Sequence, residues 1–288
     1  MSKKDGKIIS FINMKGGVGK TTLTINIAYT LAMHFKKSVL AIDMDPQFNA
    51  TQALMTKFKS IDEYQKLREK NKTIASLLTF SPRSIVDSKN GQLEILDIIQ
   101  PLIKYGEKNG ELDLIPGDLS LTEFESSQRG SEKILSRQIK KNKLKDKYDY
   151  ILIDTPATYS IYSQASLYAS DYYVVPIAPD VFATLGYSLL KSAVKNDMVL
   201  EEHNEDNKLK NLGIILTLTA NNRQKRSSIQ EAFNKDPKFS STLHENENIR
   251  SGHITTFMYD MLQTKSNIID ITDEFMEKVK GSTSNGKS

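Results

Sequence analysis

A run of glycines closed by a lysine and two threonines is the part of this sequence with the clearest chemistry. It reads Lys15-Gly16-Gly17-Val18-Gly19-Lys20-Thr21-Thr22. Glycines let a backbone bend so that successive N–H groups point at phosphate oxygens, and the N-terminus of a following helix adds partial positive charge. Lys20 would bring a full positive charge to the β- and γ-phosphates of a nucleotide, and the Thr21 hydroxyl could bind Mg²⁺. The run therefore predicts a nucleotide-binding loop, with an ordinary glycine-rich turn as the alternative.

Three aspartates follow apolar runs at positions where carboxylates could serve phosphate chemistry. Asp43 and Asp45 come after the run 39–42, and Asp154 ends the run 150–153. The carboxyl ends of parallel strands meet at one edge of a sheet, so we expect these aspartates beside the glycine loop. Phosphoryl transfer needs a metal ion near the β- and γ-phosphates, and Asp154 is placed to organise Mg²⁺ there. The alternative for Asp43 and Asp45 is to cap the next helix.

Short apolar runs alternate with helical patterns along most of the chain. The runs that predict strands are 8–12, 39–42, 112–115, 150–153, 172–177 and 212–217, and the helical patterns lie near 23–32, 160–170 and 184–202. Strands that are apolar throughout are typical of parallel sheets covered on both faces. The pattern predicts the α/β class, with a doubly wound, mostly parallel β-sheet flanked by helices as in P-loop NTPases.

We expect a single domain over residues 1–280. Residues 55–110 are less regular, and we interpret them as an irregular or inserted segment. A terminal helix is expected near 268–279, followed at 281–288 by a polar tail that we expect to be disordered. Basic residues dominate 133–147, where interleaved apolar residues predict an amphipathic helix with a solvated basic face. Contact of that face with DNA is the alternative.

Composition excludes several kinds of protein. The chain of 288 residues has no cysteine, which excludes disulfides, thiolate metal sites, Fe–S clusters and cysteine nucleophiles. Lys and Arg number 39 against 35 Asp and Glu, and this surplus of +4 is only weak support for an acidic partner. No apolar run approaches the roughly 18–20 residues of a membrane span, and the N-terminus does not look like a secretory signal. We therefore expect a cytoplasmic protein.

One departure from the common phosphate-loop pattern indicates a family. The common form, G-x-x-x-x-G-K-[ST], has glycine where this chain has Met14, and Lys15 precedes the glycines here. This form resembles the deviant Walker A motif of the ParA/MinD group of ATPases. The stretch Asp43-Met44-Asp45-Pro46-Gln47 is similar to the Asp-x-Asp-Pro-Gln of the same group. The resemblance implies that Lys15 reaches across a dimer to the partner's nucleotide, whereas the alternative is a solvated lysine.

The resemblance also implies roles for the acidic residues. Asp45 would be needed for hydrolysis by positioning water, and Asp43 would support the metal ion. Many P-loop ATPases have a glutamate base directly after the aspartate of the later strand, but here Thr155 follows Asp154. The implied catalytic set is Lys15, Lys20 and Asp45, and the implied Mg²⁺ set is Thr21, Asp43 and Asp154.

The loop after these aspartates departs from the family pattern. The family usually has Gly-Asn-Ala-Thr, and this chain has Phe48-Asn49-Ala50-Thr51. If the loop needs a positive φ at position 48, phenylalanine would be strained there. Asn13 also matches the family, although it could simply end the first strand.

Missing features separate the members of the group. The nitrogenase iron protein and the Fe–S carriers need cysteines, and MinD proteins end in an amphipathic membrane helix that this C-terminus does not resemble. The best match is a ParA-type partition ATPase that segregates a plasmid or chromosome. It implies ATP and Mg²⁺ as cofactors, slow hydrolysis, a homodimer on ATP binding, non-specific DNA binding on the nucleoid, and a stimulating ParB-type centromere-binding partner, without a membrane. The alternatives are a MinD-like membrane-surface ATPase and a ParA-like cargo-positioning ATPase.

Candidate DNA contacts lie in the last third of the chain. Binding would come from basic side chains gathered across a dimer, through phosphate contacts that weaken with salt. The candidates are Arg223, Lys225, Arg226, Arg250 and Lys265. Asn221 and Asn222 are candidates for contact with the nucleotide, as is Arg223, and a solvated role is the alternative for each of these residues.

Overall fold

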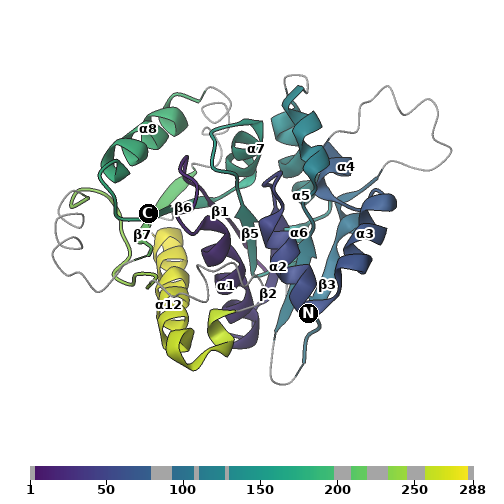
Figure 1. Ribbon diagram of the computed structural model, residues 1–288, viewed down its shortest axis with the longest axis horizontal. Coiled ribbons are helices and arrows are strands. Elements are labelled where there is room, and N and C mark those ends of the chain that lie inside the picture. The colour runs from purple at the N-terminus through teal and green to yellow at the C-terminus, as the bar shows by residue number, and fades with distance from the viewer. Residues whose placement is uncertain are drawn as a thin grey trace.

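A mostly parallel β-sheet forms the centre of the computed structural model, which describes residues 4–78, 93–106, 110–126, 130–197, 209–218, 233–244 and 257–284 (Figure 1). Its strands are β1 Lys7–Phe11, β2 Ser38–Asp43, β3 Gln100–Ile103, β4 Glu111–Ile115, β5 Tyr150–Asp154, β6 Tyr172–Ile177 and β7 Lys210–Leu216. The order across the sheet is β3-β4-β2-β5-β1-β6-β7. Every neighbouring pair is parallel except β3 and β4. The α/β prediction is confirmed.

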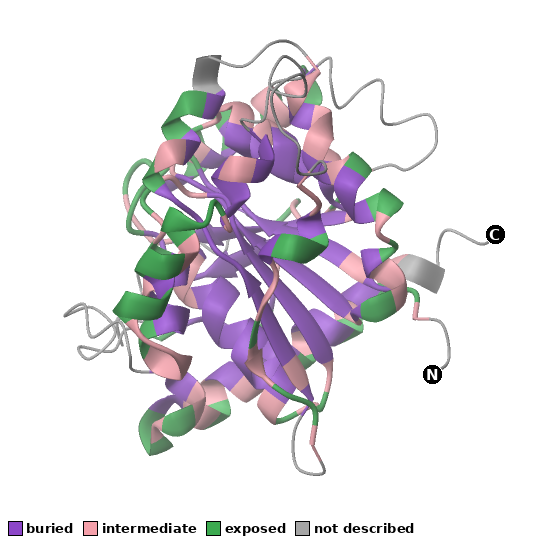
Figure 2. Ribbon diagram, turned by 90° about the vertical axis from the view of Figure 1, so that its right-hand side faces the viewer, coloured by how far each residue is buried: buried purple, intermediate pink, exposed green. Residues whose placement is uncertain are grey.

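Helices cover both faces of this sheet. They are α1 Lys20–Met33, α2 Asn49–Phe58, α3 Ile61–Glu69, α4 Ile74–Leu78, α5 Ile134–Lys141, α6 Leu144–Lys147, α7 Ile161–Ala169, α8 Ala183–Lys195 and α12 Leu262–Ser284. Short 3-10 helices lie at Ile95–Ile98, Leu119–Ser126, Ser131–Lys133 and Met258–Asp260. Apart from the edge strand β3, the strands are buried almost throughout, whereas the helices keep exposed outer sides (Figure 2).

Alternate residues of the central strands face opposite layers, which explains why these strands are apolar throughout. In β1, Ile9 and Phe11 join the cluster beneath α1 and α12, while Ile8 joins the cluster beneath α5 and α7. In β5, Leu152 and Ile151 divide in the same way. Because side chains alternate across a strand, a sheet covered on both faces needs apolar residues at odd and even positions alike.

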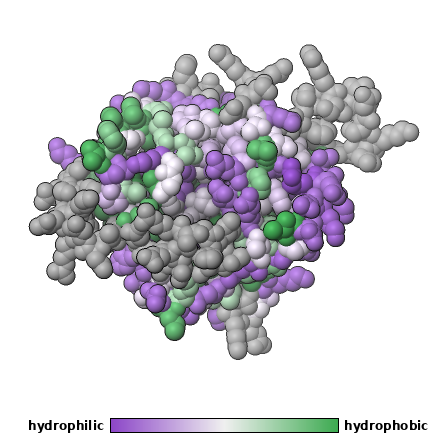
Figure 3. Space-filling model, in the orientation of Figure 1, coloured by the Kyte–Doolittle hydropathy of each residue, from purple (hydrophilic) through white to green (hydrophobic). Residues whose placement is uncertain are grey.

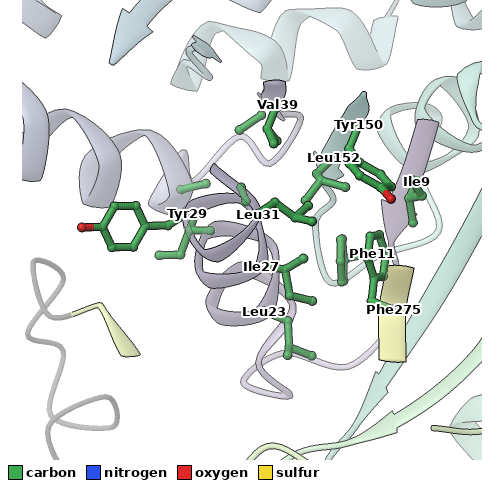
Figure 4. Close-up of a cluster of buried hydrophobic side chains, with 14 of the residues drawn as sticks. Ile9, Phe11, Leu23, Ile27, Tyr29, Leu31, Val39, Tyr150, Leu152 and Phe275 are labelled. Atoms are coloured by element: carbon green, nitrogen blue, oxygen red, sulfur yellow. The ribbon is translucent and has the colours of Figure 1, made fainter. Parts of the chain in front are cut away.

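The packing of α1 fixes the element that begins at the glycine loop. Leu23, Ile27 and Leu31 recur every fourth residue and are fully buried, and Figure 4 shows them along one side of α1, toward the sheet. The ring of Phe275 from α12 stacks on Phe11 with centroids 6.3 Å apart. Burial of a large apolar side chain contributes roughly 1.5–3 kcal/mol. These contacts therefore hold α1 and α12 against the sheet.

Helix α8 buries only one of its sides. Ala183, Tyr187 and Leu190 are buried against the sheet. On the outer side, Phe182 and Leu185 are more than half exposed, and apolar side chains accordingly reach the surface over α8 in Figure 3.

The basic run 133–147 is not the one amphipathic helix that we predicted. It forms the end of a 3-10 helix, then α5 and α6, with a break at Lys143, whose φ is 51°. A left-handed residue ends an α-helix because the hydrogen-bond ladder cannot continue through it. Leu135 and Ile139 are buried between α5 and the sheet, so the apolar side of this run was predicted correctly. The prediction of a single continuous helix was wrong.

Two segments are more ordered than the sequence indicated. The irregular segment 55–110 contains α3, α4 and β3, an edge strand whose Pro101 is tolerated because an edge needs fewer ladder donors. Helix α12 starts before and ends after the predicted 268–279, and four residues of the predicted tail are helical, through Ser284. Residues 285–288 lie outside the described part of the chain.

Candidate nucleotide-binding site

The glycine loop connects β1 to α1 at the carboxyl edge of the sheet. Gly17 and Gly19 have φ of 71° and 84°, values that favour glycine because it has no Cβ to clash. Gly19 is also the residue that begins the first turn of α1. The loop residues 14–17 are exposed, whereas Val18 is buried beneath them. Residues 14–17 of the loop are therefore open to solvent, while the buried side chain of Val18 anchors the loop in the protein.

Hydrogen bonds tie the loop to the ends of two other strands. The Asn13 side chain donates to the carbonyl of Pro176 at 2.6 Å and accepts from the amide of Lys15 at 3.0 Å. The Thr217 hydroxyl donates to the carbonyl of Val18 at 2.7 Å. Asn13 thus does more than end its strand, because its amide braces the loop against β6.

Lys20 places a largely buried ammonium at the base of the loop. The residue is 7% exposed, and its Nζ donates to the carbonyl of Lys15 at 3.2 Å. Burial lowers the pKa of this ammonium, while the nearby carboxylates of Asp154 and Asp45 act in the opposite direction. A cation removed from water is stabilised by an anion brought next to it. A phosphate at this loop would supply that anion.

Asp154 and Asp43 occupy paired positions in the neighbouring strands β5 and β2, and both are fully buried. Asp154 accepts hydrogen bonds from the Thr21 hydroxyl at 2.7 Å and the Thr24 hydroxyl at 3.4 Å. Burial raises the pKa of both carboxyl groups, that of Asp43 to about 7, and the charge of Asp43 raises the pKa of Asp154 further. A cation is therefore the natural complement of this pair.

Asp43 and Asp45 hold the loop that leads into α2. Asp43 accepts the amide and the hydroxyl of Thr51, each at 2.7 Å, and the amide of Asp45 at 3.2 Å. Asp45 is only half-buried, and one of its oxygens accepts the amide of Gln47 at 2.9 Å. Asp43 is therefore a fixed internal group, whereas Asp45 is partly exposed and near enough to Lys20 for its charge to act on that ammonium.

Phe48, which stands where the family usually has glycine, has the left-handed backbone that we considered from the sequence. Its φ is 44°, and its ring stacks on Tyr64 of α3 with centroids 5.6 Å apart. A non-glycine residue in this region costs about 1–2 kcal/mol. The contact with Tyr64 offsets part of that cost and ties the acidic loop to α3.

Lys15 pairs with a residue that sequence reasoning missed. Its ammonium forms an ion pair with Asp180, which lies in the loop between β6 and α8. The hydrogen bond from Lys15 lowers the pKa of Asp180. The lysine that we expected to face a partner is thus held within its own chain. No spacing in the sequence could have indicated this pair, because it joins two loops that only the sheet brings together.

The side-chain oxygens at this edge of the sheet suit Mg²⁺, which needs few protein ligands, better than a metal ion bound by protein side chains alone. In the described part of the chain, no three His, Asp or Glu side chains gather as a metal site would require. The available oxygens are those of Thr21, Asp43 and Asp154. Magnesium commonly takes one or two protein oxygens and completes its shell with phosphate oxygens and water. The residues present fit that ion when a nucleotide accompanies it.

Several predicted site residues lie outside the described part of the chain. They are Asn221, Asn222, Arg223, Lys225, Arg226 and Arg250. Lys265 is described: it lies in the first turns of α12, and its Nζ is 4.3 Å from the centre of the Tyr259 ring. Among the described helices, none is both long and apolar enough to cross a membrane.

A strand, a glycine loop with a buried lysine and a helix, with a carboxylate at the end of a neighbouring parallel strand, define the P-loop NTPase class. The chain belongs to the ParA-type family of partition ATPases. The family described as AAA domain matches residues 6–211.

Relatives and solved structures agree with that family. The chain is 35% identical over 227 residues to the uncharacterised protein MJECL24 of Methanocaldococcus jannaschii, covering 78% of this chain and 76% of that protein. It is 30% identical over 217 residues to the sporulation initiation inhibitor protein Soj of Bacillus subtilis, covering 74% and 73%. A putative plasmid partition protein of Borrelia burgdorferi, solved with AMPPNP, has a TM-score of 0.72 and 25% identity, covering 95% of this chain and 99% of that one.

Proposed function

We propose that this protein is a partition ATPase that binds ATP with Mg²⁺, hydrolyses it slowly, and uses the nucleotide to control dimerisation and non-specific DNA binding. The observation that carries the nucleotide part of the proposal is the buried Lys20 ammonium beneath the glycine loop, near the buried Asp154, which is paired with the buried Asp43 of the next strand. Dimerisation and DNA binding are proposed from the ParA-type family. A buried cation and a buried acidic pair at one sheet edge complement the two parts of a magnesium–nucleotide complex.

ATP would be held by the backbone of residues 15–22, with Lys20 on its β- and γ-phosphates. Thr21, Asp154 and Asp43 would hold Mg²⁺, which neutralises the charge that develops on the phosphates. The Borrelia burgdorferi relative, solved with AMPPNP, supports a nucleoside triphosphate as the ligand. Asn221 and Asn222 remain our candidates for contacts with the base.

Hydrolysis would depend on Asp45, which is half-buried and has one oxygen anchored by the amide of Gln47. It would orient the attacking water. The structure describes two arginines: Arg68 is bound to Asp118, and Arg137 is exposed on α5. The other arginines lie outside the described residues, so slow turnover without a partner is proposed from the family resemblance.

Dimerisation would bring two nucleotides to one interface, and the exposed Lys15 would then reach the partner's phosphates. Basic side chains of both copies would form the DNA surface, with Lys265 as the candidate that the structure describes. A ParB-type centromere-binding protein would stimulate hydrolysis and release the dimer, so that the ATPase cycles on the nucleoid in the cytoplasm.

A DNA-binding assay with ATP, ADP or no nucleotide across a salt series tests the proposal. We expect binding to random-sequence duplex DNA that requires ATP and falls steeply as salt rises, because phosphate contacts release counterions. Lys20→Ala, which removes the buried cation, should bind neither ATP nor DNA. Absence of DNA binding with every nucleotide at low salt would contradict the proposal.

A further inference from the structure

The Thr51 side chain lies at the junction of three segments that meet behind the acidic loop. Thr51 is in the first turn of α2 and is fully buried. Its hydroxyl donates to Asp43 Oδ2 at 2.7 Å and accepts from the amide of Gly117 at 2.8 Å. Its own amide also donates to Asp43 Oδ2 at 2.7 Å. One threonine therefore links α2, the end of β2 and the loop after β4.

The direction of these hydrogen bonds is determined. A hydroxyl has a single proton, and the Gly117 amide can only donate, so the Thr51 proton must point at Asp43. The other oxygen of Asp43 accepts the amide of Asp45 at 3.2 Å. A continuous chain of contacts thus runs from Gly117 through Thr51 and Asp43 to the backbone of Asp45.

The loop after β4 packs closely against this chain. A Cβ at Gly117 would lie 3.0 Å from the Asp43 Cγ atom, closer than ordinary contacts allow. The carbonyl of Gly117 accepts the Tyr64 hydroxyl at 2.9 Å. Tyr64 in turn stacks on Phe48, the left-handed residue at the start of α2. The hydroxyl of Thr51 therefore lies between its two hydrogen-bond partners, Asp43 on one side and the closely packed Gly117 on the other.

We infer that Thr51 is a positioning residue for ATP hydrolysis: its hydroxyl fixes the Asp43 carboxylate and, through it, the backbone from which Asp45 orients water. This inference rests on the proposed function. The side-chain hydrogen bonds of Thr51 go to Asp43 and Gly117, not to the glycine loop or to Asp45, so its removal should disturb the geometry of hydrolysis more than the binding of ATP. Residues that orient the groups of a metal site typically contribute 10–100-fold to affinity or activity.

The test compares Thr51→Val, which keeps the shape and removes the hydroxyl, with Thr51→Ser, which keeps the hydroxyl. Thr51→Val should lower kcat for ATP hydrolysis about tenfold or more, while the Kd for a fluorescent ATP analogue changes less than about threefold. Thr51→Ser should restore most of kcat. Equal kcat in Thr51→Val and the wild type overturns the inference, as does a serine variant as slow as the valine variant.

A matched control separates positioning from general stability. Thr272 is also a fully buried threonine, but its hydroxyl donates only to Ile268 within α12, at 2.6 Å. Thr272→Val should therefore keep wild-type kcat even if its Tm falls as far as that of Thr51→Val. A comparable loss of kcat in Thr272→Val assigns the effect to stability and overturns the inference.

A second variant covers the case in which Thr51→Val does not fold. Gly117→Ala keeps the threonine but puts a methyl group against Asp43, so it should lower kcat with little change in the Kd for the ATP analogue. Wild-type kcat in a folded Gly117→Ala overturns the inference. If the wild type itself binds ATP but never hydrolyses it, with or without DNA, the proposed function fails first and the role of Thr51 with it.

Discussion

Lys15 of the glycine loop forms an ion pair with Asp180, 165 residues further along the chain. The two residues extend from different loops at the same edge of the sheet, one after β1 and one after β6. In the proposed cycle, Lys15 must leave this carboxylate to reach the phosphates of a partner's nucleotide. The ion pair thus competes with dimerisation.

Removing that carboxylate should favour the dimer. Because an exposed ion pair is worth about 0–1 kcal/mol and a symmetric dimer would break two of them, Asp180→Asn should lower the protein concentration needed for the ATP-dependent dimer by at most about thirtyfold. Analytical ultracentrifugation with ATP measures this. Asp5→Asn, which breaks the exposed pair with Lys7 at the start of β1, is the control and should have no effect. A weaker dimer for Asp180→Asn would mean that Asp180 supports the interface.

The open carboxylate of Asp45 should be needed for hydrolysis and not for binding. Asp45→Ala should bind ATP and dimerise with wild-type affinity but lose at least about a hundredfold in single-turnover hydrolysis, the range expected when a group that activates water is removed. The exposed Asp62→Ala on α3 provides the control. Full activity in Asp45→Ala would require another residue to position the water.

The left-handed backbone at Phe48 predicts an unusual order of stabilities. Phe48→Ala and Phe48→Gly both lose the stacking on Tyr64, but only glycine adopts a φ of 44° without strain. We expect the glycine variant to exceed the alanine variant by about 1 kcal/mol in free energy of unfolding. Urea denaturation measures the difference. The reverse order, usual within a helix, would show that the backbone relaxes when the ring is removed.

A buried acid away from the nucleotide site should make stability depend on pH. Asp113 in β4 is 6% exposed, its Oδ2 accepts the Tyr148 hydroxyl, and its Oδ1 has no hydrogen-bond partner among the described residues. Burial raises the pKa of Asp113 to about 6. The folded state therefore holds a proton that the unfolded chain releases near pH 4, and this group's contribution to stability is lost as pH rises toward 6 and above.

Asp113→Asn removes this titration. The free energy of unfolding of the variant minus that of the wild type should increase between pH 4 and pH 8, by at most about 3 kcal/mol. Chemical denaturation at both pH values measures the change, and other titrating groups cancel in the difference. A difference that stays constant with pH would show that Asp113 is ionised in the folded protein at pH 4 and above.

Local spacing was enough to predict most of the sheet and the candidate site residues that it brings to one edge. A glycine loop between a strand and a helix needs only neighbours in sequence, and so do the aspartates that end β2 and β5. Apolar runs identified all of the parallel strands because both faces of this sheet are buried. The short edge strand β3 was missed, since four residues paired on one side leave too weak a pattern.

Tertiary structure decided which groups meet. The register of β2 and β5 pairs Asp43 with Asp154, the loop after β4 brings Gly117 to Thr51, and the loop after β6 brings Asp180 to Lys15. The break at Lys143 and the contact of Phe48 with Tyr64 of α3 were likewise visible only in the folded structure. The sequence by itself determined which residues are candidates to bind and cleave a nucleotide, because that prediction depends on residue type and local spacing. Only the folded sheet decided how those residues are held, because contacts between distant segments follow from the order and register of its strands.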